Sequence, residues 1–126
     1  MHPKQFESVT ALDAPNRYSY FVRKVADFEK VWGLFEDGWA LMGDDAGNQI
    51  LPVWPEREFA EALAQGDWAT HTAKAISLKD FVEKWLPGME KDGKQLAVFP
   101  TPSGKGVLVA PPRLLTDLRS EMKQYE

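Results

Sequence analysis

The stretch of residues 38–55 constrains the fold most strongly, because two strand-like runs lie on either side of a turn-forming segment. The apolar run 39–42 (WALM) and the alternating run 49–54 (QILPVW) both have the length of a strand. Between them, residues 43–48 (GDDAGN) combine Asp and Asn side chains, which can hydrogen-bond the nearby backbone, with glycines that accept a positive φ. This pattern predicts a β-hairpin.

A further strand is expected just before this hairpin. Residues 31–35 (VWGLF) are connected to it through Glu36, Asp37 and Gly38, and Asp-Gly is a strong short-range hairpin signal. We therefore expect a three-stranded antiparallel meander over residues 31–53. Pro52 has no backbone N–H, which indicates that the last strand is not fully paired on both sides.

The remaining apolar spacing predicts helices and a second hairpin. Amphipathic helices are expected over residues 15–28, 55–66, 77–91 and 111–122, with a short one within residues 1–13. Pro87 and Gly88 must end or kink the third of these. A short strand is expected over residues 72–76, and a hairpin over residues 95–99 and 106–110.

Helices that alternate with antiparallel hairpins predict an α+β fold. We expect a single domain over residues 1–126, with a mixed, mostly antiparallel sheet covered by helices mainly on one face. Residues 1–13 would form a peripheral N-terminal helix.

Composition and charge narrow the classes of function. The chain has no cysteine, which excludes disulfides and thiolate metal sites. Its net charge is -4 with Lys and Arg scattered along the chain, so we expect no nucleic-acid partner. No apolar run approaches the roughly 20 residues of a membrane span, and the first residues lack the apolar core of a signal peptide. We expect a cytoplasmic protein with no membrane partner.

The candidate catalytic and metal-binding patterns are incomplete. Asp44 and Asp45 lack the alternating ligands of an EF-hand, and residues 101–106 lack the full pattern of a phosphate-binding loop. His71 stands in a predicted loop, where we expect a surface residue, and the other histidine, His2, is near the terminus. We therefore expect no catalytic residue, no metal and no cofactor.

The tryptophans are the remaining lead, because five in 126 residues is a high number. Two or three are expected in the core, since each indole buries a large area. Trp39 and Trp54 stand at strand ends and could instead line a cleft. The candidate binding residues are these two tryptophans with the nearby carboxylates, namely Asp37, Trp39, Asp44, Asp45 and Trp54.

Many of these aromatic and proline positions resemble a bacterial family catalogued as domain of unknown function 2750. The matching pieces run from residue 17 to residue 118: Arg17-Tyr18 with Phe21 and Val25, Val31-Trp32, Gly38-Trp39-Ala40, Pro52-Val53-Trp54-Pro55, Ile76-Ser77-Leu78 with Phe81, Trp85-Leu86-Pro87-Gly88 and Val98-Phe99-Pro100-Thr101-Pro102. The order of strands and helices is also similar, more faintly, to SseB-type domains. The family resemblance implies a fold and leaves the chemistry open.

Three functions remain open from the sequence. The first is a non-enzymatic protein-binding module that uses the aromatic and acidic end of the meander; an immunity or inhibitor protein that meets a basic toxin is one version. The second is an enzyme or small-ligand-binding protein with a pocket between sheet and helices. It predicts a carboxylate with a raised pKa near Trp39, Trp54 or Trp85. The third is membership of a larger assembly without separate activity.

Overall fold

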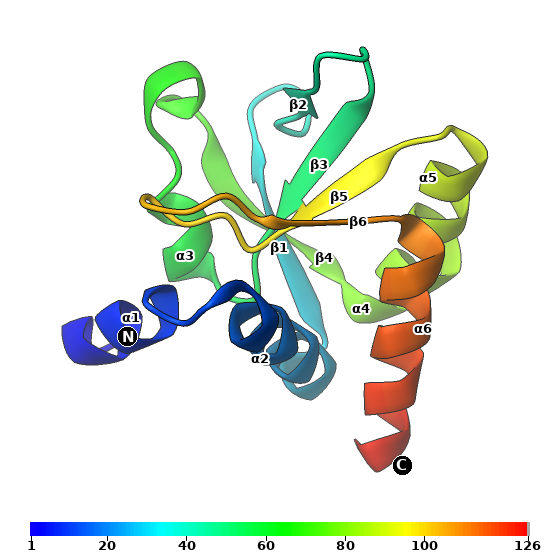
Figure 1. The fold of residues 1–126 in the computed structure, drawn as a ribbon, viewed down its shortest axis with the longest axis horizontal. Helices are drawn as coiled ribbons and strands as arrows, with labels where there is room; N and C mark the ends of the chain where they lie inside the picture. The colour runs from blue at the N-terminus through cyan, green and yellow to red at the C-terminus, as the bar shows by residue number, and fades with distance from the viewer. Residues whose placement is uncertain (126) are drawn as a thin grey trace.

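Two β-sheets form the centre of the molecule, which is described here for residues 1–125 of a computed structural model (Figure 1). The strands are β1 (Lys30–Phe35), β2 (Met42–Gly43), β3 (Gln49–Val53), β4 (Thr72–Ser77), β5 (Gln95–Val98) and β6 (Val107–Val109). One sheet is the antiparallel pair β1-β4, and the other has the order β2-β3-β5-β6. Only β3 and β5 are parallel. The expected α+β class with mixed, mostly antiparallel pairing is confirmed.

The expected three-stranded meander is wrong in its first strand. The β2-β3 hairpin forms, with Met42 opposite Ile50, but its first strand is only Met42–Gly43 instead of the expected residues 39–42. Strand β1, however, pairs along its whole length with β4, from Lys30 opposite Ser77 to Phe35 opposite Thr72. A six-residue ladder satisfies many more backbone groups than the single bridge that Phe35 forms with Trp39. The pairing with the distant strand therefore prevails over the hairpin.

The two sheets are joined at one point, where Trp32 and Trp54 form an antiparallel bridge. The Trp32 N–H donates to Trp54 O at 2.9 Å, and the Trp54 N–H donates to Trp32 O at 2.8 Å. Pro52, two residues earlier, pairs with Ala97 of β5, while β2 reaches only Gln49 and Ile50. Pro52 thus has a strand on one side only, as its missing N–H predicted.

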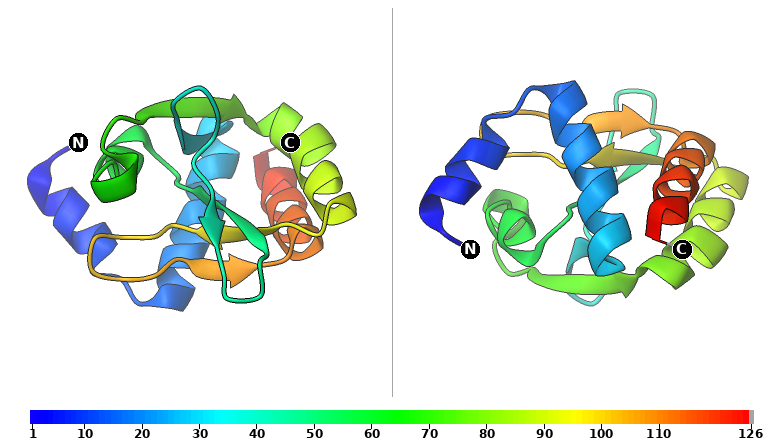
Figure 2. Two further views of the ribbon diagram at one scale, coloured as in Figure 1. Left: turned by 90° about the horizontal axis from the view of Figure 1, so that it is seen from above. Right: turned by 90° about the horizontal axis from the view of Figure 1, so that it is seen from below.

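Helix α2 (Ala14–Phe28) covers the strands from one side, and α6 (Pro111–Met122) lies beside it in both views of Figure 2. The Asp13 carboxylate accepts a hydrogen bond from the Asn16 N–H at 3.0 Å and so caps the start of α2. Phe21 and Val25 are fully buried, as their helical spacing predicted. Phe28, expected on the same stripe, is instead 51% exposed because it is the last residue of the helix.

Two short helices lie at the opposite end of the molecule from α6, as Figure 2 shows. They are α1 (Pro3–Thr10) and α3 (Arg57–Glu61), the latter followed by a 3₁₀ turn over Gly66–Trp68. Phe6 of α1 stacks on Phe59 of α3 with ring centroids 5.3 Å apart, and Val9 is buried. The predicted N-terminal helix is therefore attached to the core by its apolar face.

The helical segment after β4 is irregular in its middle. It consists of α4 (Leu78–Asp80), a π-helical turn (Phe81–Trp85) and α5 (Leu86–Lys91). Ser77 Oγ accepts a hydrogen bond from the Asp80 N–H at 3.2 Å, which confirms the predicted cap. Pro87 has no N–H to donate to the carbonyl of Glu83. The π turn, whose hydrogen bonds span five residues instead of four, ends two residues before this proline.

The loop between β5 and β6 is a hairpin loop, as expected from its departure from phosphate-binding patterns. Thr101 N–H donates to Gly104 O at 2.9 Å, and Gly104 N–H donates back to Thr101 O at 3.2 Å. One hydrophobic core lies between the sheets and the helices, and Trp54, Phe59 and Phe99 are its large aromatic members. Within residues 1–125, no helix combines the length and the apolarity needed to cross a membrane.

Candidate functional site

Trp39 is the centre of the candidate site and lies just beyond the end of β1. Its ring meets Phe35 edge to face, with centroids 5.2 Å apart, and the two residues also form a backbone bridge. Gly33 makes room for the indole, because a Cβ at that residue would lie 2.9 Å from the Trp39 atoms Cε3 and Cζ3. The Trp39 side chain is half-buried, so one part packs and the other part remains accessible.

A second indole completes the wall of a pocket. Trp85, the last residue of the π turn, meets Trp39 edge to face at 5.2 Å and is also half-buried. The pocket between them measures about 430 Å³. Its apolar lining comes from both indoles with Leu41, Leu51 and Met89. Leu41 is 41% exposed, so the apolar surface continues out of the pocket.

The charged residues around this pocket are mainly lysines. Lys84 and Lys94 line it together with one carboxylate, Asp92. A third lysine, Lys74 of β4, places its Nζ 4.0 Å from the centre of the Phe35 ring and 5.6 Å from that of Trp39. An ammonium over an aromatic face is attracted by the ring quadrupole. The pocket lining itself therefore carries two positive side chains and one negative one, while Glu36 and Asp37, on the turn between Phe35 and Trp39, lie outside it.

Trp54 does not belong to this pocket, which corrects the predicted pairing of Trp39 with Trp54. Its side chain is fully buried, and its Nε1–H donates to Pro100 O at 2.8 Å. The bridge to Trp32 fixes its backbone as well. Trp54 is thus a core residue at the junction of the sheets and has no surface with which to contact a partner.

The predicted carboxylates lie on turns and do not line the pocket. Asp37 is exposed on the turn after β1, with a φ of 55°. Asp44 organises the β2-β3 turn, since its carboxylate accepts hydrogen bonds from the side chain and backbone of Asn48 and from the Ala46 N–H. The Asn48 side-chain bond is the largest of the effects that lower the pKa of Asp44. Asp45 is exposed beside it, and a binding role for the three remains a prediction.

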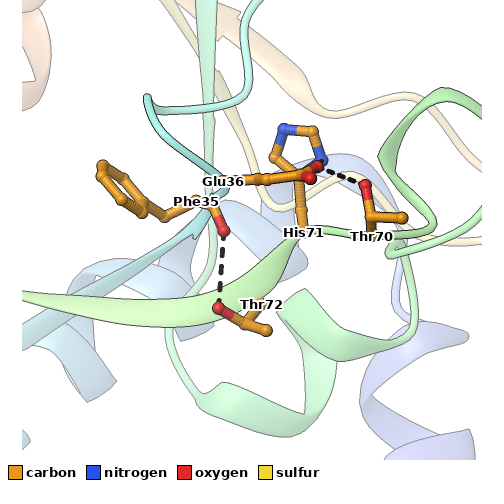
Figure 3. A network of polar contacts seen from close by, with 5 residues as sticks. All are labelled: Phe35, Glu36, Thr70, His71 and Thr72. Carbon is orange, nitrogen blue, oxygen red and sulfur yellow. Dashed lines mark hydrogen bonds and ion pairs between the residues drawn. The ribbon is translucent and has the colours of Figure 1, made fainter.

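Figure 3 shows a polar cluster at the end of β1 that includes His71. The Thr70 hydroxyl donates to Glu36 Oε2, and His71 Nδ1 lies 3.7 Å from the same oxygen. The His71 side chain is only 16% exposed, so the expected surface histidine is mostly covered. The Thr70 hydroxyl donates to the carboxylate rather than to the imidazole, so the geometry of a nucleophile–base pair is not present here.

A second, more open hollow of about 630 Å³ lies where α1, the end of α2 and the start of α3 meet β1. It contains Glu56 and Trp32, and the Arg57 guanidinium lies 5.0 Å over the Trp32 ring. The Tyr20 hydroxyl donates to Glu56 Oε1 at 3.1 Å. Burial raises the pKa of Glu56, and this hydrogen bond opposes the effect. The indole beside this carboxyl is Trp32, which the sequence had not marked as a site residue.

Comparison with known families identifies the group to which the chain belongs. The profile of the family described as "Protein of unknown function (DUF2750)" matches residues 18–118. The chain belongs to the DUF2750 family. A search of curated proteins found no match. Membership in DUF2750 confirms the resemblance drawn from the aromatic and proline positions. The description of the family names no biochemical activity.

Of the two indoles that wall the Trp39–Trp85 pocket of this DUF2750 protein, the sequence marked only Trp39 as a candidate binding residue. Trp39 was predicted as a binding residue, and Trp85 had a place only in the enzyme alternative. The lysines were not predicted, because Lys74 lies in β4, Lys84 in the π turn and Lys94 in the turn before β5, so they form no cluster in sequence. Among residues 1–125, no group of three His, Asp or Glu side chains is arranged to hold a metal ion.

Proposed function

We propose that this protein is a non-enzymatic binding module of the cytoplasm that recognises another protein through the pocket walled by Trp39 and Trp85. The observation that carries the proposal is the pair of half-buried indoles beside the exposed Leu41. Tryptophan is enriched among the residues that contribute most of the binding energy at protein interfaces, where a partner completes its desolvation. With 15 Lys and Arg against 19 Asp and Glu, the chain as a whole disfavours a nucleic-acid partner.

The pocket changes the expected charge of the interface. An immunity or inhibitor role rested on acidic residues around the tryptophans, but the lining contains Lys84 and Lys94 against Asp92. Support for a basic toxin as the partner is therefore weaker than support for protein binding in general.

The test is an affinity capture with the full chain as bait, compared between variants. We expect proteins that the wild type retains to be lost with Trp85→Ala and kept with Trp32→Ala. Trp32 is a matched control, because it is also half-buried but lies in the other hollow. A set of captured proteins that Trp85→Ala leaves unchanged would contradict binding through this pocket.

A second candidate function is small-ligand binding in the hollow that contains Glu56. A carboxyl with a raised pKa, held by Tyr20 and set beside Trp32, is the kind of group that acts as an acid or base. Ligand-induced shifts in melting temperature, measured for wild type and Glu56→Gln with a metabolite collection, test this candidate. Ligands that stabilise both proteins equally would argue against a role for Glu56.

A further inference from the structure

We propose that the partner of the Trp39–Trp85 pocket is an acidic peptide segment with a bulky apolar anchor residue. This inference rests on the proposed function and adds the chemistry of the partner. The anchor would occupy the pocket, and carboxylates on either side of it would face the lysines. The segment thus needs both features, because the pocket offers an apolar interior and a cationic surrounding.

The shape of the pocket fits a single large side chain from an extended segment. Trp39 and Trp85 meet at an interplanar angle of 88°, so their ring faces are not closed against each other. Leu51 and Met89, both buried, add apolar surface to the lining. Leu or an aromatic side chain placed here would bury apolar area at roughly 25 cal/mol for each Å² removed from water.

Three lysines lie in or beside the pocket. Lys84 and Lys94 line the pocket, and Lys74 lies over the Phe35 and Trp39 rings. The carboxylates near these lysines are Asp92 in the lining and Asp80, which lies 3.6 Å from Lys84 Nζ. On the side of Lys74, Glu36 and Asp37 are exposed on the turn between Phe35 and Trp39 but do not line the pocket. The Lys84–Asp80 pair is exposed on both sides and contributes little, so Lys84 can exchange it for a partner carboxylate at small cost.

Within the pocket lining, Lys84 and Lys94 against Asp92 give an excess of positive charge, opposite in sign to the net charge of -4 for the whole chain. Charge of one sign around an apolar pocket favours partners of the other sign and speeds their encounter. A basic segment would meet the lysines with like charge. The charge complementarity therefore selects an acidic segment over a basic one.

The indoles can also contribute polar contacts. Among the described residues, Trp54 Nε1–H has a protein acceptor in Pro100 O, whereas the Nε1–H groups of Trp39 and Trp85 have none. Neither of these two nitrogens is completely buried without a partner. A carboxylate or carbonyl oxygen of the bound segment is a suitable acceptor for them.

The experiment uses the full chain and three sets of fluorescein-labelled peptides with a central Leu, Phe or Trp. The residues beside the anchor are Glu in the first set, Gln in the second and Lys in the third. Fluorescence anisotropy measures the Kd of each peptide. We expect the Glu peptides to bind about tenfold more tightly than the Gln peptides and the Lys peptides to bind weakest, with a smaller difference at high salt.

Variants connect this preference to the lysines. We expect the double variant Lys84→Glu with Lys94→Glu to reverse the order, and the neutral double variant Lys84→Gln with Lys94→Gln to abolish it. Lys4→Glu is the matched control, because Lys4 is an exposed lysine on α1 at the other end of the molecule. Equal Kd values for the three sets would overturn the acidic-segment proposal.

The outcomes for the partner chemistry and for the proposed function are distinguishable. If Trp85→Ala abolishes peptide binding but the flanking charge has no effect, protein binding at the pocket stands and the acidic preference fails. If no peptide binds while the affinity capture still depends on Trp85, the acidic-segment proposal fails alone. If neither peptides nor captured proteins depend on Trp85, both fail.

Discussion

At the scale of single residues, Gly33 decides where the Trp39 indole lies. No positive φ is needed at this glycine; the constraint is the close approach of the ring. The Trp39 ring is packed against Phe35 and Trp85, so it cannot yield as the end of a flexible side chain would. One missing methyl group therefore sets the position of one wall of the pocket.

We expect Gly33→Ala to lower the free energy of unfolding by about 1–3 kcal/mol, the usual cost of overpacking, and to displace Trp39. Urea denaturation measures the first effect, and near-ultraviolet circular dichroism reports the second. The matched control is Gly38→Ala, since a Cβ there would meet no atom within 4 Å. Equal stability and spectra for the two variants would show that the ring moves freely.

Glu56 makes stability depend on pH through a single side chain. Burial raises its pKa in the folded protein above the ordinary value of 4.5. Its contribution to stability is therefore fully present below pH 4.5 and is lost as the pH rises through the raised pKa. Burial also raises the pKa of its partner, Tyr20.

We expect wild type to lose stability relative to Glu56→Gln as the pH rises from about 4.5, because Gln cannot ionise. Denaturation midpoints of both proteins across this range give the comparison. Glu61→Gln, which replaces an exposed carboxylate at the other end of α3, is the control for the loss of one negative charge near this helix. A constant difference for Glu56→Gln would contradict the raised pKa.

At the scale of elements, the π turn over Phe81–Trp85 determines how Trp85 reaches the pocket. The apolar spacing of residues 78–89 would fit a regular α-helix, so the irregularity comes from Pro87 rather than from the pattern. In place of the regular ladder, the Leu86 N–H bonds to the Phe81 carbonyl five residues back. The wider turn sets Trp85 against Trp39 while Leu86 and Met89 stay buried.

We expect Pro87→Ala to raise the free energy of unfolding by about 1 kcal/mol, because alanine restores the N–H and Pro87 itself is exposed. Peptide binding should weaken at the same time, as Trp85 shifts with the helix. Pro112→Ala is the control: Pro112 lies in the first turn of α6, where the N–H has no helical partner. A loss of stability in Pro87→Ala would mean that the π turn is required for packing.

At the scale of the whole molecule, Arg17 connects segments that are far apart in the chain. Its guanidinium is in a side chain only 7% exposed and donates to three carbonyls, those of Leu12, Phe99 and Lys105, at 2.9, 3.1 and 2.9 Å. These acceptors come from the α1-α2 loop, the end of β5 and the β5-β6 loop. The buried charge is thus stabilised by carbonyl dipoles from both halves of the chain.

We expect Arg17→Met to lower the free energy of unfolding by about 3–5 kcal/mol. Three hydrogen bonds of roughly 1.5–3 kcal/mol each are lost, and this loss is partly offset because the buried guanidinium no longer has to be desolvated. Guanidinium denaturation provides the measurement, and Arg113→Met, an exposed arginine on α6, provides the comparison. If Arg17→Met were as stable as wild type, the cost of burying the charge would match the strength of its hydrogen bonds.

Local features of the fold could be predicted because neighbouring residues encode them. The Asp44–Asn48 turn, the Ser77 cap and the buried stripe of α2 depend on contacts within a few positions of the chain. Pro52 was predicted to lack one neighbouring strand from the chemistry of the residue alone. The family was also identified from the spacing of aromatic and proline residues, whereas the fainter similarity to SseB-type domains remains a prediction.

The sequence by itself therefore determined most of the helices and strands, the Ser77 cap and the Asp44 turn, although the strand expected over residues 39–42 is reduced to Met42–Gly43 and the helix expected over residues 55–66 to Arg57–Glu61. Only the tertiary structure decided that β1 pairs with β4, that β3 lies parallel to β5 and that Trp54 is buried under Pro100. It also placed Lys84 and Lys94 in the lining of one pocket and Lys74 over the Trp39 ring. Turns and helices depend on hydrogen bonds between residues that are close in the sequence. Pairing between distant strands depends instead on how much apolar surface the whole chain can bury and how many of its backbone groups can be hydrogen-bonded at the same time.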